Sequence, residues 1–157
     1  MSQPESRRSF IGKAGIVGVA ALAGAQSATV AAQSPAGKKI VPGSPFKTFS
    51  RATIFDRVVH VAGVVGQTAS GDMASSEFQP QCRQAMENLK AAVEASGSSM
   101  DKVLKCNCFL TSYGDFAAFN KIYVTYFPTA PPARSTVVVK ELVVPGAKLE
   151  IDCIAHI

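Results

Sequence analysis

The strongest constraint on the fold is a valine-rich run at positions 58–65, where five of the eight residues are valine. The valines stand at both odd and even positions, and successive side chains of a strand point to opposite faces of its sheet. Both faces of this segment are therefore mostly apolar, with His60 as the main exception. Such a pattern is typical of a strand in the middle of a sheet, with neighbours on both sides.

Strand and helix patterns alternate around this run. Apolar residues recur at helical spacing in two segments, of which the first ends at Gly97 and the second stops before Pro128. β-branched or alternating residues predict the other strands. The predicted elements are strands at 47–55, 103–111, 135–139 and 148–157 and helices at 77–96 and 115–127. This order indicates an α+β fold, a mixed sheet with two helices packed on one face. The other face needs cover, and its apolar content favours packing against identical subunits.

The beginning of the chain has the features of an export signal. The pair Arg7-Arg8 is followed by twelve small or apolar residues at 14–25 and then by Val30-Ala31-Ala32. Paired arginines before an apolar run are typical of the twin-arginine route. A membrane span takes about 20 residues, so this run suits a signal peptide better than an anchor. The alternative is a frayed, alanine-rich N terminus on a cytoplasmic protein.

The paired arginines, the apolar run and the small residues that follow it agree with one another, so export is the favoured interpretation. The sequence then divides into a twin-arginine signal peptide at 1–32, a linker at 33–46 rich in Ser, Pro, Gly and Lys, and a domain at 47–157. This division predicts a periplasmic or secreted protein with no stable membrane anchor after cleavage.

Charge and cysteine content exclude two classes of protein. The chain has 157 residues and a net charge of +5, but beyond residue 32 it carries 13 basic and 10 acidic residues, a net charge of +3. So small an excess does not make a phosphate-binding face, and no nucleic-acid partner is expected. Four cysteines are too few for a disulfide scaffold.

Histidine and cysteine offer few arrangements for chemistry. His60 lies inside the valine-rich strand, where a hydrogen-bonded structural histidine is favoured over a ligand, and His156 is next to the end of the sequence. Cys106 and Cys108 project from one strand face, and Cys153 on another strand could lie near them. A thiolate metal site or a redox pair stays open, but thiols in the core are favoured because cysteine is among the most buried residue types.

Two charged residues stand where they could bind or react with a substrate. Arg134 follows a loop stiffened by two prolines and opens a β-branched strand, so its guanidinium could clamp a carboxylate in a bidentate manner. A surface salt bridge is an equal alternative. Glu150 faces away from the apolar stripe of the last strand, where it could orient a water or accept a proton. The alternative is an ordinary solvent-facing glutamate.

Several motifs in one order resemble the Rid family, the reactive intermediate deaminases, which are also called YjgF-like. The resemblance covers the chain from about residue 49 to 155, nearly the whole predicted domain. The motifs that carry it are Pro132-Ala133-Arg134-Ser135-Thr136, Leu149-Glu150-Ile151-Asp152-Cys153-Ile154-Ala155, the helix string at 81–89 and the segments at 95–99 and 109–116.

This resemblance implies a chorismate-mutase-like fold and a homotrimer whose clefts lie between subunits. Members of the family hydrolyse enamines and imines, such as 2-aminoacrylate and 2-iminopropanoate, to 2-keto acids and ammonia without a metal or organic cofactor. By resemblance, Arg134 grips the substrate carboxylate and Glu150 places and activates the attacking water. Asn120 matches the asparagine of the family's second helix, and the backbone around Gly63 and Thr136 completes the cleft wall.

Two departures from the family pattern concern this site. Phe49 stands where the family commonly has tyrosine, and Ala62 and Val64 stand where it has serine and glutamine. Each lost polar group could be worth about one to a few kcal/mol if it touched the substrate. An altered substrate range is therefore expected, with substrate contacts at Phe49. The alternative function is a non-catalytic trimer that binds small carboxylates or acts as a chaperone.

Overall fold

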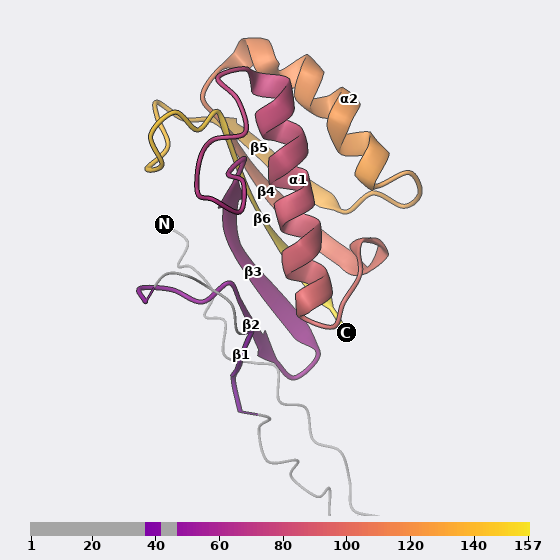
Figure 1. Ribbon diagram of the computed structural model, residues 1–157. Coiled ribbons are helices and arrows are strands. Elements are labelled where there is room, and N and C mark those ends of the chain that lie inside the picture. The colour runs from indigo at the N-terminus through magenta and orange to yellow at the C-terminus, as the bar shows by residue number, and fades with distance from the viewer. Residues whose placement is uncertain (1–36, 42–46) are drawn as a thin grey trace, which may run out of the picture. The chain divides into compact units, whose positions relative to one another are not determined.

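The computed structural model describes residues 37–41 and 47–157, so the predicted signal peptide and most of the predicted linker lie outside the described residues. Over those two ranges the chain forms one six-stranded sheet in the order β1-β2-β3-β6-β4-β5 (Figure 1). Neighbouring strands are antiparallel, except that β4 and β5 run parallel. The elements are β1 Lys39–Val41, β2 Ala52–Phe55, β3 Val58–Val65, α1 Phe78–Ala95, η1 Met100–Lys102, β4 Val103–Leu110, η2 Tyr113–Asp115, α2 Phe116–Tyr126, β5 Ala133–Val138 and β6 Leu149–His156.

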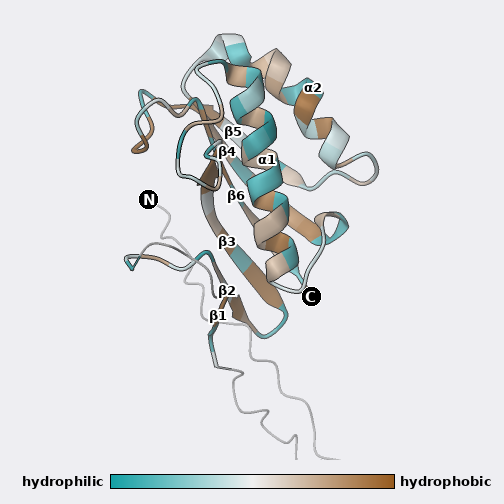
Figure 2. Cartoon of the chain, viewed as in Figure 1, coloured by the Kyte–Doolittle hydropathy of each residue, from teal (hydrophilic) through white to brown (hydrophobic). Residues whose placement is uncertain are grey.

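Both long helices cover the same face of the sheet. Helix α1 lies across β3 and β6, and α2 packs beside it and connects the parallel strands β4 and β5 (Figure 1). Figure 2 shows hydrophilic residues on the outer face of α1 and hydrophobic strands behind this helix. The inner stripe of α1 is buried and consists of Phe78, Gln81, Cys82, Ala85, Met86, Leu89, Ala92 and Val93. The predicted α+β sandwich, a mixed sheet with two helices on one face, is confirmed.

Strand β6 alternates as its sequence predicts. Leu149, Ile151, Cys153 and Ala155 are buried under the helices, whereas Glu150, Asp152, Ile154 and His156 are half-buried on the opposite side. This second side is called the open face below, because neither long helix covers it. All four cysteines, Cys82, Cys106, Cys108 and Cys153, are free and buried. Burial raises the pKa of the Cys82, Cys108 and Cys153 thiols to about 12, as expected for core thiols.

His60 lies within β3, as predicted, and is exposed on the open face, opposite Thr53 of β2 and Ile154 of β6. Strand β3 occupies the middle of the sheet, but only one of its faces is covered by helices within the chain. Val58 is exposed on the open face for the same reason. That His60 is a structural histidine rather than a ligand stays a prediction.

The beginning of the domain also differs from the prediction. Strand β1 lies inside the segment interpreted as a linker, and β2 begins at Ala52, five residues after the predicted start at Lys47. Val41 pairs with Ala52 and is buried, so three residues suffice to add an edge strand. The strand was not predicted because it has only three residues and the Pro, Gly and Ser residues around it are typical of a linker.

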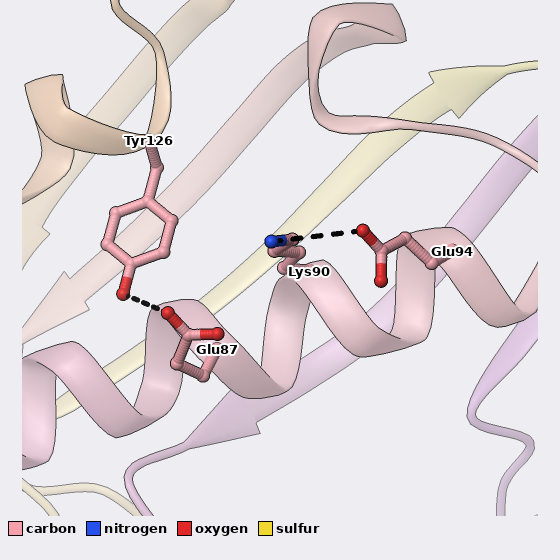
Figure 3. Close-up of polar contacts among 4 residues, drawn as sticks. All are labelled: Glu87, Lys90, Glu94 and Tyr126. Atoms are coloured by element: carbon pink, nitrogen blue, oxygen red, sulfur yellow. Dashed lines mark hydrogen bonds and ion pairs between the residues drawn. The ribbon is translucent and has the colours of Figure 1, made fainter.

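A polar contact ties the two long helices together on their outer side. The Tyr126 hydroxyl of α2 donates a hydrogen bond of 2.6 Å to the Glu87 carboxylate of α1, while Lys90 and Glu94 form an i,i+4 ion pair at 4.0 Å on α1 (Figure 3). Burial, followed by the Glu87 contact, raises the pKa of Tyr126 to about 12. None of the helices in the described part of the chain is long and apolar enough to cross a membrane.

Candidate functional site

Arg134 lies between the sheet and α2. It is level with Cys106 in the parallel pairing of β5 with β4, and Cys106 is buried under the helices. The guanidinium carbon lies 4.6 Å from the ring centre of Tyr123 and 5.1 Å from that of Phe119. A third ring, that of Phe116, is 5.9 Å away. Arginine stacks well on aromatic faces, so these rings hold the planar group in place.

The hydrogen bond that Arg134 makes leaves its charge uncompensated. Its Nη2 donates to the Asn120 Oδ1 at 2.7 Å, and the amide is neutral. Among residues 37–41 and 47–157, the ion pair found joins Lys90 to Glu94 and does not include Arg134. The surface salt bridge considered as an alternative is therefore not formed here. A fixed guanidinium without an acidic partner is well suited to bind an anion.

The side chains that contact Arg134 come from one face of α2. Phe116, Phe119, Asn120 and Tyr123 follow the spacing i, i+3, i+4 and i+7, which brings side chains together on a helix. From the sequence, the apolar positions of this helix were expected only to pack against the sheet. Their spacing predicted the common face, but nothing in it predicted an arginine as the partner.

Two buried hydroxyl groups lie next to Arg134. Thr136 is two residues along β5, on the same face, beside the Cys108 thiol, and the Tyr123 hydroxyl lies beside the Cys106 thiol. Within the described residues neither hydroxyl has a nitrogen or oxygen partner. Arg134, Asn120, Thr136 and Tyr123 therefore form one polar group at the boundary of β5 and α2, here called the arginine half-site.

Glu150 lies on the open face, next to Gly63. A Cβ atom added at Gly63 would stand 2.0 Å from the Glu150 Oε1, so only glycine leaves room for this carboxylate. The pairing of β3 with β6 is irregular between Val61 and Val64, which brings Gly63 into this position. Burial raises the pKa of Glu150 above its ordinary value, and the Asp152 carboxylate adds to this effect. Gly63 and Glu150 are called the glutamate half-site.

Phe49 and Ala62 line a pocket of about 440 Å³ beside the middle of β3. The other residues that line it are Lys38, Thr48, Ser50, Thr53, His60 and Val61. Phe49 is about half exposed. Ala62 precedes Gly63 along β3, but neither Gly63 nor Glu150 lines this pocket.

The structure brings the predicted residues together in two sets. Arg134, Asn120 and Thr136 share the helix-covered side, whereas Gly63 and Glu150 share the open face. The alternation along β6 explains the separation, because Ile151 is level with Cys108 and Thr136 while Glu150 is level with Phe109 and Val137. A single chain therefore does not unite its arginine and its glutamate in one cleft. No group of three or more His, Cys, Asp or Glu that could hold a metal occurs in the part of the chain described.

Comparisons with known proteins identify the family of this chain. The family model described as endoribonuclease L-PSP matches residues 41–157. A 2-iminobutanoate/2-iminopropanoate deaminase of Dermatophagoides farinae is 36% identical over 114 residues, which are 72% of this chain and 88% of the mite protein. Among solved structures, the Rid-family protein YyfA of Yersinia pestis, described as of unknown function, is 31% identical with a TM-score of 0.73 over 77% of this chain and 100% of that one.

A second solved structure, that of TdcF from E. coli with bound serine, is 29% identical and has a TM-score of 0.71, over 76% of this chain and 98% of that one. The fold, the motifs around Arg134 and Glu150, and these matches point the same way. The chain belongs to the endoribonuclease L-PSP family, the family that its motifs identified under the name Rid.

Proposed function

We propose that this protein is an enamine/imine deaminase that hydrolyses intermediates of the 2-aminoacrylate and 2-iminopropanoate type to 2-keto acids and ammonia. The observation that carries the proposal is the guanidinium of Arg134, which has no acidic partner among the described residues and is held by three aromatic rings and by Asn120. The name of the mite relative describes this activity, and TdcF was solved with an amino acid, which has the carboxylate that such a guanidinium would bind.

The two half-sites divide the reaction between them. Arg134 binds the carboxylate and so fixes the position of the neighbouring imine carbon. A water then attacks this carbon and forms the new C–O bond, while the C=N π electrons move to the nitrogen and Glu150 accepts one proton of the water. Glu150 passes this proton to the nitrogen, which gives a carbinolamine with an NH2 and an OH group. The hydroxyl proton then moves to the nitrogen by way of Glu150, the C–N bond breaks, ammonia leaves and the carbon–oxygen double bond forms. The raised pKa of Glu150 favours this role, because it strengthens the carboxylate as a base.

The active cleft, in this proposal, forms between subunits of a homotrimer. Arg134 and Glu150 lie on opposite sides of the sheet, so a site that contains both takes one residue from each of two chains. Apolar side chains on the open face, such as the exposed Val58 and Val137, support a packing of sheets there. Closed rings of identical subunits are the usual way to cover such a face.

The substrate range of this protein differs, in our proposal, from that of other family members. Phe49 offers no hydroxyl, and Ala62 and Val64 offer neither a hydroxyl nor an amide near Gly63. Export through the twin-arginine route is part of the same proposal, supported by Arg7-Arg8 and the apolar run that follows. Fractionation of cells that produce Arg7→Lys/Arg8→Lys beside wild type tests the export. Periplasmic delivery unchanged by the double substitution would contradict it.

Ammonia and keto-acid release from enzymatically generated 2-iminopropanoate tests the deaminase activity. We expect wild type to exceed the buffer rate and Arg134→Ala to lose at least about a hundredfold in kcat/KM, because both the ionic contact and the orientation are lost. Arg83→Ala, which removes an exposed arginine from α1, is the matched control and should retain full activity. Equal rates for wild type, Arg134→Ala and buffer would refute the proposal.

A non-catalytic carboxylate-binding protein is the second candidate, supported by the polar groups that Phe49, Ala62 and Val64 do not provide. It predicts keto-acid binding in calorimetry that disappears in Arg134→Ala, without turnover of any imine. Because the family description names an endoribonuclease, RNA is tested as a further ligand and substrate, by its retention and by its cleavage. The net charge of +3 beyond residue 32 leads us to expect neither retention nor cleavage of RNA.

A further inference from the structure

Asp152 is a second carboxylate on the strand that bears Glu150. The two residues are two positions apart on β6, so both side chains project from the open face. Side chains at this spacing are about 7 Å apart along a strand. Asp152 has no role in the proposed reaction.

The Asp152 carboxylate is held in place by its neighbour across the sheet. The Asn107 side chain on β4 is level with Asp152, and its Nδ2 donates a hydrogen bond of 2.8 Å to the Asp152 Oδ1. Both residues are half-buried. This neutral donor orients the carboxylate and leaves its negative charge in place. A lysine or arginine donor would neutralise that charge.

Three other charged or titratable groups, Lys105, His60 and His156, stand farther from Glu150 on the open face. Lys105 of β4 and His60 of β3 are level with Ile154, four residues along β6, and His156 lies beyond it. The direct neighbours of Glu150 across the sheet are Phe109 on β4 and Val65 on β3, and β5 continues this row with Val137. Helices α1 and α2 cover the other side. Asp152 and Lys148 each stand two positions from Glu150, Asp152 within β6 and Lys148 just before it. The charge that acts on the Glu150 pKa is that of Asp152.

We propose that Asp152, oriented by Asn107, is a positioning residue that acts through Glu150 and makes its carboxylate a stronger base in the deaminase reaction. The inference rests on the proposed function, since it concerns the base of that same reaction. A fixed negative charge opposes the ionisation of a neighbouring acid, and the partly buried setting of Glu150 weakens the screening by water. Consistently, the Asp152 charge acts together with burial to raise the pKa of Glu150.

Carbon-13 NMR titration of the Glu150 carboxyl group tests this proposal without any assay of activity. The signal is assigned by its loss in Glu150→Gln. In Asp152→Asn, which is nearly isosteric and keeps a partner for Asn107, the titration midpoint of Glu150 should move to lower pH. Asp152→Glu keeps the charge and should restore a midpoint close to that of wild type. Glu141→Gln removes an exposed negative charge elsewhere and should change nothing.

The pH dependence of kcat/KM is the second measurement. If Glu150 is the base, activity rises as Glu150 ionises, so Asp152→Asn should move this acidic limb to lower pH and lower the plateau by a few-fold, about the effect of a weaker base. An unchanged or raised NMR midpoint in folded Asp152→Asn would overturn the inference. Absence of activity in wild type would instead overturn the proposed function, and the NMR midpoint would still decide whether Asp152 acts on Glu150.

Discussion

Gly63 and Gly66 are three residues apart, but an added methyl group would meet a different kind of neighbour at each position. At Gly63 the nearest atoms belong to the end of the Glu150 side chain, with the Oε1 at 2.0 Å. At Gly66 they belong to the backbone of α1, where the Gln81 carbonyl oxygen would be 2.4 Å away. A side chain can rotate away, whereas a packed helix has to shift as a whole. A larger residue at position 63 therefore displaces the Glu150 carboxylate, whereas one at position 66 disturbs the packing of α1.

Gly63→Ala is expected to leave the protein folded and to lower its deaminase activity. The methyl group displaces the Glu150 carboxylate, so kcat/KM should fall by about tenfold or more, while the free energy of unfolding changes by about 1 kcal/mol or less. Urea unfolding and ammonia release measure the two effects. Gly114→Ala, whose Cβ would stay 3.4 Å from the Ser112 Oγ, is the control. Full activity in Gly63→Ala would show that the position of Glu150 does not matter.

Glu150→Gln is expected to stabilise the protein at neutral pH while it lowers activity. Because the pKa of Glu150 is raised in the folded state, folding favours its protonated form, and stability falls as pH rises from the ordinary glutamate value through the raised one. A neutral glutamine avoids this loss. Urea unfolding at pH 7 should show Glu150→Gln to be more stable than wild type, with the difference vanishing in acid. Lower stability of the variant at pH 7 would contradict the raised pKa.

How much of the site could be predicted differs from residue to residue. The strand pattern and the proline-stiffened loop were enough to select Glu150 and Arg134 as candidates, because charge, alternation and loop stiffness are written in the sequence. The contact between Gly63 and Glu150 depends on the irregular pairing between Val61 and Val64, which no periodicity reveals. Asn107 and Asp152 also pass as ordinary polar residues until the register of β4 and β6 brings them level.

At the scale of elements, α2 carries both packing and binding on a single face. Its apolar periodicity predicted where the helix lies and which side faces inward, and both are confirmed by the buried Phe119, Ile122 and Tyr123. Periodicity alone does not identify the partner of that side. The arginine of β5 becomes its partner because β5 runs parallel to β4, with α2 as the connection.

Asn120→Asp is expected to weaken substrate binding and to stabilise the fold. A carboxylate at the place of the Asn120 Oδ1, 2.7 Å from the Arg134 Nη2, would pair with the guanidinium and compete with the substrate carboxylate. We expect KM and the keto-acid Kd to rise about tenfold or more, with a higher Tm. Gln79→Glu makes the same amide-to-acid change at an exposed position of α1 and should leave KM and the keto-acid Kd unchanged. An unaltered keto-acid Kd in Asn120→Asp would show that Arg134 does not hold the ligand.

At the scale of the whole molecule, the separation of the two half-sites and the uncovered face of the sheet have to be explained together. Sequence patterns predicted that one side of the sheet would need cover, and the exposed Val58 and Val137 agree with this. They could not predict that Arg134 and Glu150 would lie on different sides, because that depends on the order β6-β4-β5 and on its registers. A subunit that packs on the open face would cover apolar side chains there, and the same assembly offers a way to join an arginine half-site to a glutamate half-site.

Mixed assembly separates a shared site from one contained in a single chain. Arg134→Ala and Glu150→Gln subunits, each inactive alone, are refolded together at equal amounts and their ammonia release is measured. In a ring where each site takes Arg134 from one subunit and Glu150 from the next, random mixing makes about a quarter of the sites complete, so about a quarter of the wild-type activity should return. A site within one chain would gain nothing from mixing, since every chain in the mixture lacks one of the two groups. Activity that stays at the level of the separate variants, in assemblies shown by native mass spectrometry to be mixed trimers, would therefore exclude the shared cleft.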